Sequence, residues 1–552
     1  MQEGGVKAAA GAEAVDIIYR NCEIFNPFTC EWESGHIAIF DGRIAGIGDY
    51  QARRECDLSG ARVVPGLIDA HLHIESSLLA PTEFARLVLP HGTTTVVADP
   101  HEIANVCGAR GISYMLEESR RTALDIFLML PSCVPATPLD VGGACLSASD
   151  LAEFSGRDRI CGLGEMMNVP GVLAGDPDVA AKLALFDLID GHAPLLSGKD
   201  LNAYIYAGAQ SDHECTRRAE AREKLLRGMY IMMREGSTER NLAELVPLVT
   251  ACSAPRCCFA TDDRHADMLA DEGHIDDCIR KSVEYGLDLE LALRMATLSA
   301  AERFRLHDRG AIAPGRIADF CILEDSEEFR VSGTVKAGTP YVDPGHAPAP
   351  GISCPFNCRV PDRGAIRIDG AGEARVIGLV EGQIITRDLR YQVDAAGIPD
   401  TERDLLKAVV CDRYRGSGSG TGLVHGFGLQ EGGIASSISH DCHNIVAVGV
   451  DDGDIIRAIR EVVRLGGGMA AVTGDDVTAL PLDCAGLMSS LPYEEVVFGL
   501  RQLDLHAERL GAVGNPFMHL SFLALTVIPH LRITGRGLFD VLASADVPLF
   551  LE

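Results

Sequence analysis

The sequence predicts an α/β protein: a (β/α)8 TIM-like barrel with a small composite β domain and an additional C-terminal α/β domain. Three observations lead to this prediction. The chain has 552 residues, which is too long for one ordinary domain. Eight apolar, strand-like segments alternate with amphipathic stretches over residues 66–309, close to the ~250 residues typical of such a barrel. Short β-type segments with turn residues flank that region on both sides.

The first predicted element is a small β domain built from two separate segments. Residues 15–65 contain the β-type runs VDIIYRNCEIFNP, GHIAIFDGRIAGIG and RVVPG, separated by turn residues. A similar phrase, GAIAPGRIADFCIL, returns at residues 310–323. We therefore predict that residues 1–65 and 310–345 form one composite β domain, with a larger domain inserted between them.

The inserted domain, residues 66–309, is predicted to be the barrel. Its strand candidates are GLIDAHLH, TTTVVAD, DIFLMLPS, ICGLGEMMN, FDLIDGHAP, AYIYAGAQSDHE, MYIMMREGS and CCFATDDR. Amphipathic helical stretches separate most of them, among them PTEFARLVLPH, PDVAAKLALFDLI, TRRAEAREKLLRG and TERNLAELVPLVTAC. An open, doubly wound sheet is the alternative, but no glycine-rich phosphate-binding turn follows the first strand.

A third region, residues 346–552, is predicted to form the C-terminal α/β domain. The Pro/Gly-rich stretch AGTPYVDPGHAPAPG leads into it. The runs ARVIGLVEGQIITRDL and HNIVAVGV are β-type, whereas GDIIRAIREVVRLGGG is helical. The long uncharged stretch between Arg509 and Arg532 contains proline, asparagine and histidine, so we expect a buried helix or strand pair there instead of a membrane span.

Composition and charge exclude several classes of protein. Hydrophobic residues make up 47% of the chain and charged residues 23%, which indicates a globular protein. The 49 basic and 79 acidic residues give a net charge of −30, which disfavours binding to nucleic acids or anionic membranes. The N-terminus lacks the basic start and leucine-rich core of a signal peptide, and the 18 cysteines contain no CxxC motif. We therefore expect a cytoplasmic protein with reduced cysteines.

Ligand-type side chains follow the predicted barrel strands. His71 and His73 end the first strand, and because they are two residues apart their side chains share one face. In barrel enzymes the carboxyl ends of the strands carry the chemistry. The other residues that end predicted strands are Asp99 with His101 and Glu102, then Glu165, His192, His213, and Asp262 beside Asp263.

Four histidines and two carboxylates at one rim predict a site for two divalent metal ions, with Glu165 placed to bridge them. Imidazole and carboxylate ligands suit Zn, Mn or Fe(II). Two such ions can lower the pKa of a shared water, and an aspartate beside it can take the proton. Each residue also has a simpler interpretation: His192 as a structural histidine, Glu165 as a cap or an arginine partner, and Asp262 and Asp263 as helix N-caps.

The wording of the motifs resembles a known family. HxH on the first strand, a bridging group on the fourth, histidines on the fifth and sixth and an aspartate on the eighth resemble the amidohydrolase superfamily. The phrases PGLIDAHLHIESS, GTTTVVADPHEIANV, GEMMN, DGHAP, GRIADFCIL and ISHDCHNIVAVG resemble the bacterial adenine deaminases within it. Most members of the superfamily have a carboxylated lysine on the fourth strand. Here CGLGEMMN offers Glu165 and no lysine, as in the adenine deaminases.

The resemblance implies hydrolysis of adenine to hypoxanthine and ammonia by a bridging hydroxide at a binuclear Mn or Fe(II) centre, with Mn2+ the most favoured metal. The implied proton acceptor is Asp262, chosen over Asp263 because it comes first after the apolar run. Asp99 and Glu102 are our candidates for contacting the purine, and Glu102 for protonating its ring. Adenine is the expected partner, and we expect a homo-oligomer. The implied metal ligands are His71, His73, Glu165, His192, His213 and Asp262.

Two motifs in the last region remain open. HDCHN at residues 440–444 offers two histidines, an aspartate and a cysteine, which suits either another metal site or residues that pack over the barrel mouth. RLGGG at residues 464–468 is either a weak phosphate loop or a helix C-cap followed by a turn.

Three alternative functions make different demands on the sequence. The zinc-dependent nucleobase deaminases require H-x-E followed by P-C-x-x-C; His73-Ile74-Glu75 satisfies the first half, but CPFNC at residues 354–358 does not satisfy the second. A related amidohydrolase acting on N6-methyladenine or a cyclic amide would use the same metal chemistry. A non-catalytic barrel that serves in assembly would not need the complete ligand set found here.

Overall fold

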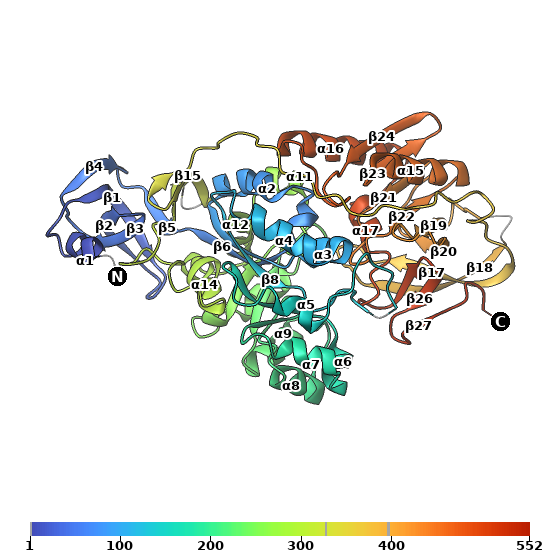
Figure 1. The fold of residues 1–552 in the computed structure, drawn as a ribbon, viewed down its shortest axis with the longest axis horizontal. Coiled ribbons are helices and arrows are strands. Elements are labelled where there is room, and N and C mark those ends of the chain that lie inside the picture. Colours follow the sequence, from blue (N-terminus) through green and yellow to red (C-terminus); the bar gives the residue numbers. More distant parts are fainter. Residues whose placement is uncertain (1–2, 138, 326–327, 395–397, 552) are drawn as a thin grey trace.

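The computed structural model describes residues 3–137, 139–325, 328–394 and 398–551, which form three parts in a row (Figure 1). A small β-sheet part containing the N-terminus lies at one end of the molecule. The barrel occupies the middle, and residues 346–551, called the C-terminal region below, lie at the other end. We keep the predicted boundaries of these parts as a proposal.

The first part is one sheet with the strand order β16-β15-β14-β5-β1-β2-β3, with β4 paired to β1. Strand β5, before the barrel, pairs antiparallel with β14, after it, so that Val63 lies opposite Ile322. Segments more than 250 residues apart in sequence therefore share a sheet, and the chain enters and leaves the barrel at adjacent strands. The elements are α1 (Glu3–Ala9), β1 (Val15–Asn26), β2 (Glu31–Phe40), β3 (Arg43–Ile47), β4 (Ala52–Asp57), β5 (Arg62–Pro65), β14 (Phe320–Asp325), β15 (Arg330–Lys336) and β16 (Thr339–Pro340).

The middle part is a closed ring of eight parallel strands, which confirms the predicted fold class. Strands β6 to β10 form one parallel run and β11 to β13 another. The Gln210 N–H donates to the Ile189 carbonyl (3.2 Å) between the two runs, and Asp262 bonds through its backbone to His71 and His73 beside β6 (3.1 Å each). The strands are β6 (Leu67–Leu72), β7 (Thr93–Ala98), β8 (Asp125–Leu130), β9 (Ile160–Met166), β10 (Ile189–Gly191), β11 (Ser211–Asp212), β12 (Tyr230–Arg234) and β13 (Cys257–Ala260).

Helices connect the barrel strands, and one predicted segment differs. The run AYIY, assigned above to the sixth strand, belongs to a helix, so that strand is only Ser211–Asp212. In the described residues no helix is both apolar enough and long enough to cross a bilayer. The helices are α2 (Pro81–Val88), α3 (His101–Cys107), α4 (Ala109–Glu118), α5 (Ala148–Ala152), α6 (Val169–Ala174), α7 (Pro177–Leu183), α8 (Gly198–Tyr206), α9 (Arg218–Leu226), α10 (Leu242–Leu245), α11 (Ala266–Asp271), α12 (Ile275–Glu284), α13 (Leu289–Arg294) and α14 (Ala300–Arg303).

The C-terminal region contains an eight-stranded mixed sheet, ordered β18-β17-β20-β19-β22-β21-β23-β24, and a three-stranded sheet, β25-β26-β27. Helix α15 ends at Leu465, and Gly466 follows in the left-handed conformation (φ 74°), so RLGGG is a C-cap and turn. The elements are β17 (Ala371–Leu379), β18 (Thr386–Asp394), β19 (Leu406–Cys411), β20 (Ser419–His425), β21 (Gly433–Ser436), β22 (Ile445–Gly449), α15 (Asp452–Leu465), β23 (Gly468–Thr473), β24 (Asp476–Pro481), α16 (Tyr493–Arg509), α17 (Pro516–Ser521), β25 (Leu531–Thr534), β26 (Gly537–Asp540) and β27 (Ala545–Asp546).

The barrel and the C-terminal region share one apolar core. Buried side chains of the barrel, such as Phe84 and Val88 of α2, belong to the same cluster as Ile434 of β21 and Leu500 of α16. Arg86 of α2 adds an ion pair to Glu494 of α16 (3.0 Å). Because apolar burial is the main stabilising term in folding, the two parts stabilise each other.

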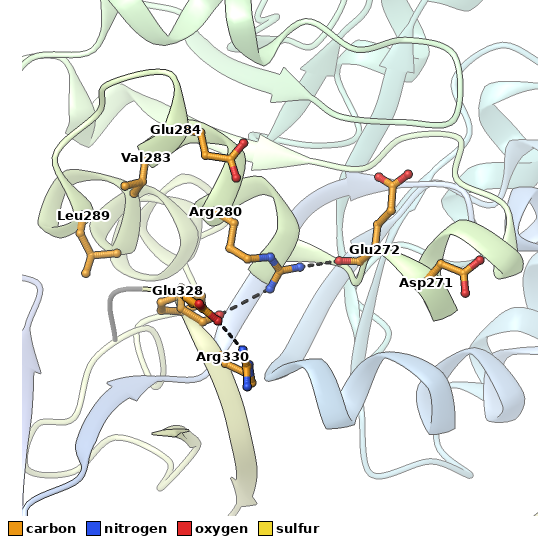
Figure 2. Close-up of a pocket in the computed structure, with 9 residues that line it drawn as sticks. Asp271, Glu272, Arg280, Val283, Glu284, Leu289, Glu328 and Arg330 are labelled. Atoms are coloured by element: carbon orange, nitrogen blue, oxygen red, sulfur yellow. Dashed lines mark hydrogen bonds and ion pairs between the residues drawn. The ribbon is translucent and has the colours of Figure 1, made fainter. Parts of the chain in front are cut away.

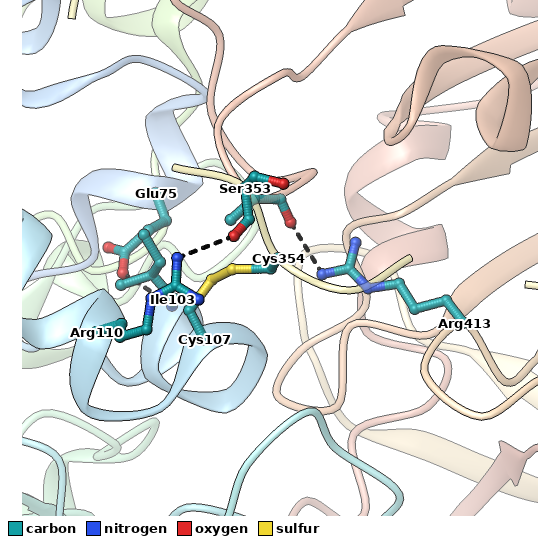
Figure 3. The surroundings of a disulfide bond; sticks show 8 residues. Glu75, Ile103, Cys107, Arg110, Ser353, Cys354 and Arg413 are labelled. Carbon is teal, nitrogen blue, oxygen red and sulfur yellow. Dashed lines mark hydrogen bonds between the residues drawn. A yellow bond between two sulfur atoms is a disulfide. The ribbon is translucent and has the colours of Figure 1, made fainter. Parts of the chain in front are cut away.

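A disulfide also joins the two parts (Figure 3). Cys107, the last residue of α3, is bonded to Cys354 at the start of the C-terminal region, 247 residues later. Arg110 lies beside this link and donates to the Ser353 carbonyl (3.2 Å). The expectation that all cysteines are free thiols is therefore wrong for this pair, because sequence alone does not bring such distant residues together.

We expect thiol titration of the denatured, unreduced protein to find 16 reactive thiols per chain, because 16 cysteines are free in the structure. After reduction the count should rise to 18, the number of cysteines in the sequence. The Cys107→Ser variant is the control and should give 17 thiols with or without reduction. A count of 18 before reduction would contradict the bond.

Candidate metal centre

The candidate ligands lie where the barrel strands end. His71 is in β6, and His73 comes directly after the last residue of that strand. Side chains alternate in direction along a strand, so these two residues, which are two positions apart, point the same way. Glu165 is in β9, whereas the others stand one or two residues beyond their strands. All six are at most 7% exposed. The remaining three, each beyond its strand, are His192, His213 and Asp262.

One oxygen of Glu165 faces the first group of ligands. Its Oε1 lies 3.0 Å from His73 Nε2 and 3.3 Å from His71 Nε2. Asp262 Oδ1 lies close to the same two nitrogens, 3.2 Å from that of His73 and 3.4 Å from that of His71. Four ligand atoms from three strand ends therefore lie close together.

The other oxygen of Glu165 faces the second group. Its Oε2 lies 2.8 Å from His192 Nδ1 and 3.4 Å from His213 Nε2. The His71 and His213 rings stack at 4.1 Å between centroids, which joins the two groups. Each carboxylate oxygen of Glu165 therefore lies beside a different group of ligand atoms.

The donor set fits divalent ions. Two atoms that each bind one ion at about 2.1 Å lie roughly 3.0–3.4 Å apart at tetrahedral or octahedral angles, which matches the spacing of the first group. Buried polar atoms normally have hydrogen-bond partners. Here Glu165 Oε1 and His71 Nε2, which both face the first group, are buried and have none. Imidazole and carboxylate donors of this kind suit Mn, Fe(II) or Zn.

Asp262 Oδ1 lies beside both histidines of the first strand, and Asp263 also has a ligand atom within 4.8 Å of those of His73 and Asp262. Asp263 Oδ1 accepts a hydrogen bond from Ser76 Oγ. Asp262 has φ 55°, a conformation that aspartate and asparagine adopt more readily than most residues. Its Oδ2 accepts from Arg234 Nη1 (2.9 Å). Burial raises the pKa of Asp262, but the adjacent imidazoles of His71 and His73 hold the net pKa well below its usual value.

Asp99 and Glu102 lie beside the same cluster. Asp99 Oδ2 accepts from the Glu165 N–H (3.0 Å), whereas Oδ1 is buried without a hydrogen-bond partner and lies 3.7 Å from His101 Nδ1. Both Glu102 oxygens contact histidines of the C-terminal region, His440 and His443. Burial raises the pKa of Glu102, but these two rings bring its net pKa well below the usual value. The ionised form of Glu102 is therefore favoured, whereas a resting proton donor would need the neutral one.

Four further side chains complete the site, and the sequence analysis assigned no role to them. His101 Nδ1 lies 3.5 Å from Glu165 Oε1. Arg234 ends β12 and pairs with both Asp262 and Glu214. Asp441 Oδ1 contacts His101 Nε2 (3.2 Å). The sequence could have indicated His101, Glu214 and Arg234, because each of these polar residues stands at or just after the end of an apolar strand. Asp441 comes from the HDCHN motif, which packs over the barrel mouth.

A separate cavity of about 630 Å3 lies away from this cluster (Figure 2). Its two arginines are paired within the lining: Arg280 donates to the Glu272 carbonyl, and Arg330 pairs with Glu328. It contains none of the predicted site residues. Its lining is Asp271, Glu272, Arg280, Val283, Glu284, Leu289, Glu328, Phe329 and Arg330.

We expect Mn2+ binding to release protons and to weaken as the pH falls, starting above the usual imidazole pKa. Burial lowers the pKa of His73 and His213, but the neighbouring carboxylates raise the net pKa of each well above its usual value. A raised pKa keeps an imidazole protonated to higher pH, and only the neutral form binds metal. Calorimetric titration in buffers of different ionisation enthalpy measures the released protons. An affinity that does not change with pH would contradict the expectation.

Two family models match most of the chain. The model of the amidohydrolase family matches residues 62–340, and that of the adenine deaminase C-terminal domain matches residues 383–545. A solved structure of N-acetyl-D-glucosamine-6-phosphate deacetylase from Mycobacterium smegmatis superposes with a TM-score of 0.47 at 20% identity, covering 59% of this chain and all of that one.

Two relatives of similar length match this chain over nearly all of its residues. Adenine deaminase of Methanoculleus marisnigri is 71% identical over 514 residues, which is 93% of this chain and 99% of that protein. Adenine deaminase of Methanoregula boonei is 60% identical over 547 residues, 99% of this chain and 98% of that protein. Both relatives are archaeal, so the resemblance holds for the family and not for its bacterial members in particular.

Proposed function

Because the chain belongs to the adenine deaminase family, we propose that it hydrolyses adenine to hypoxanthine and ammonia. The observation that supports this most is the position of Glu165. Its two oxygens face two separate groups of ligand atoms, the arrangement that hydrolysis at a binuclear centre requires.

We propose that His71, His73 and Asp262 hold one divalent ion, His192 and His213 the other, and Glu165 both. A bound pair would lower the pKa of a water and supply hydroxide at neutral pH. Mn2+ is our first choice of metal, with Fe2+ or Zn2+ as alternatives, because all three accept imidazole and carboxylate ligands.

The protein residues would then orient the base and move protons. Asp262 is ionised and points at the centre, so it accepts the proton of the water whose oxygen adds to C6 of adenine. Asp99, through its free Oδ1, and Glu102 contact the purine. Glu102 passes a proton to a ring nitrogen, which draws electrons from C6. Since the pKa of Glu102 is low, it would take that proton from the water as hydroxide forms, so that the two protons of the water end on the ring nitrogen and on ammonia. The proton on Asp262 leaves with ammonia.

An absorbance assay of adenine turnover by Mn-loaded protein tests this function. We expect conversion to hypoxanthine with one ammonia released per turnover. A parallel assay with N6-methyladenine, followed by methylamine detection, tests the alternative substrate that the same metal chemistry would accept. Absence of adenine turnover by protein that contains two ions per chain would contradict the proposal. A cytoplasmic location and a homo-oligomeric state stay predictions.

A further inference from the structure

The segment Ser439–Asn444, between β21 and β22, lies over the barrel rim and contacts Glu102. Glu102 is in the first turn of α3 and is 1% exposed. Its Oε1 contacts His440 Nδ1, and its Oε2 contacts His443 Nε2. Two residues almost 340 positions further along the chain therefore occupy both oxygens of one carboxylate at the candidate metal centre.

The backbone around His443 fixes which of its nitrogens carries the proton. The Ser439 N–H donates to His443 Nδ1 (3.3 Å), and the His443 N–H returns a bond to the Ser439 carbonyl (2.6 Å). Since Nδ1 accepts, the hydrogen of the neutral ring must be on Nε2, which faces Glu102. Burial is the main reason that the pKa of His443 is lowered, which agrees with a neutral ring.

His440 is held in place by different contacts. Its N–H donates to the Ser521 carbonyl (2.9 Å), and its ring stacks on Phe522 with 4.7 Å between centroids and 16° between planes. This stacking at the end of α17 sets the plane of the ring. Nδ1 then points at Glu102, and Nε2 lies 3.9 Å from Asp263.

The rest of the segment is anchored on both sides. Tyr414 Oη donates to the Cys442 carbonyl (2.8 Å), and Asn444 Nδ2 donates to the Val141 carbonyl of the barrel (2.9 Å). Asp441 contacts His101. These bonds leave the two histidines few alternative positions.

We propose that His440 and His443 of the C-terminal region position the Glu102 carboxylate over the purine, so that the barrel's active site is complete only with this region in place. The proposal rests on the proposed function. A free glutamate side chain samples several rotamers, whereas two imidazole donors from an anchored segment hold one. Both histidines act through Glu102 and are positioning residues.

Paired substitutions test the proposal, because each histidine donates from a different nitrogen. The amide nitrogen of glutamine can reach the place of Nε2, and that of asparagine the place of Nδ1. We expect His443→Gln and His440→Asn to keep kcat for adenine within about tenfold of the wild type. His443→Asn and His440→Gln, with the donor misplaced, should lower kcat about 10- to 100-fold, the loss typical of a hydrogen bond to a charged group.

A variant of Glu102 separates positioning from packing. In the Glu102→Gln background the four histidine variants should cause little further loss, because the group they position is already altered. The control is His506→Asn, a buried histidine of α16 that contacts Thr478 Oγ1 (2.9 Å). It should leave kcat unchanged. Thermal unfolding of each variant shows whether the fold is retained.

An NMR measurement on the protein without substrate tests the contacts of His440 and His443 with Glu102 separately from adenine turnover. Imidazole N–H protons bonded to a carboxylate give strongly downfield NMR signals, and two of these should disappear in Glu102→Gln protein. Wild-type protein without adenine turnover, but with these two signals, would refute the proposed function and leave the inference standing. Equal kcat for the Asn and Gln variants at each position, additive losses with Glu102→Gln, or unchanged downfield signals would overturn the inference.

Discussion

Glu165→Gln protein is expected to bind at most one divalent ion per chain and to lose at least about 1000-fold in kcat for adenine. The reason is geometric: Oε1 faces His71, His73 and Asp262, whereas Oε2 faces His192 and His213. A glutamine keeps one oxygen and presents an N–H donor to the other group, so one group loses an anionic ligand. Metal analysis after dialysis and an adenine assay at saturating Mn2+ measure both effects.

The matched control is Glu118→Gln. Glu118 is also 1% exposed and charged, but it pairs with Arg121 at the end of α4 (2.8 Å), outside the site. It should change stability without changing the metal content. If Glu165→Gln protein retained two ions and near-normal turnover, the bridging role of Glu165 would be refuted.

Asp262→Asn protein is expected to lose about 100- to 10,000-fold in kcat, the range typical for loss of a general base. An amide cannot accept the proton of the attacking water. Asparagine tolerates the left-handed backbone at this position (φ 55°), so the rim should keep its conformation. The amide also weakens the contact with Arg234, which now pairs with the carboxylate at 2.9 Å.

Metal content must be measured together with kcat, because Asp262 also belongs to the first group of ligands. Near-normal metal content with low kcat would assign the loss to proton transfer. The matched variant is Asp263→Asn, since the Asp263 carboxylate lies in the same cluster as His73 and Asp262 but is hydrogen-bonded to Ser76. A smaller loss for Asp262→Asn than for Asp263→Asn would reverse the choice between the two aspartates.

The fold could be predicted largely because the barrel strands are apolar runs of regular spacing. The error at AYIY shows the limit of that signal, since a run of four apolar residues fits a buried helix and a buried strand equally well. Helix α8 contains this run, and its Tyr204 hydroxyl donates to the Met166 carbonyl (2.7 Å) and accepts from the His192 N–H (3.0 Å). The misassigned segment thus supports the rim from outside the sheet.

The metal centre could be predicted because parallel strands end at one rim, which brings their last residues together whatever their distance in sequence. No such rule applies to His440 and His443, whose segment connects two antiparallel strands, β21 and β22, in another part of the chain. Only tertiary packing brings them to Glu102. The disulfide between Cys107 and Cys354 was missed for the same reason.

The apolar core shared by the barrel and the C-terminal region has a consequence for synthesis on the ribosome. Phe84 and Val88 are made early, whereas Leu500 is made more than 400 residues later. Until then the nascent barrel exposes the apolar side chains that later pack against the C-terminal region. We therefore expect a chain terminated at residue 345 to aggregate or to stay bound to chaperones when expressed.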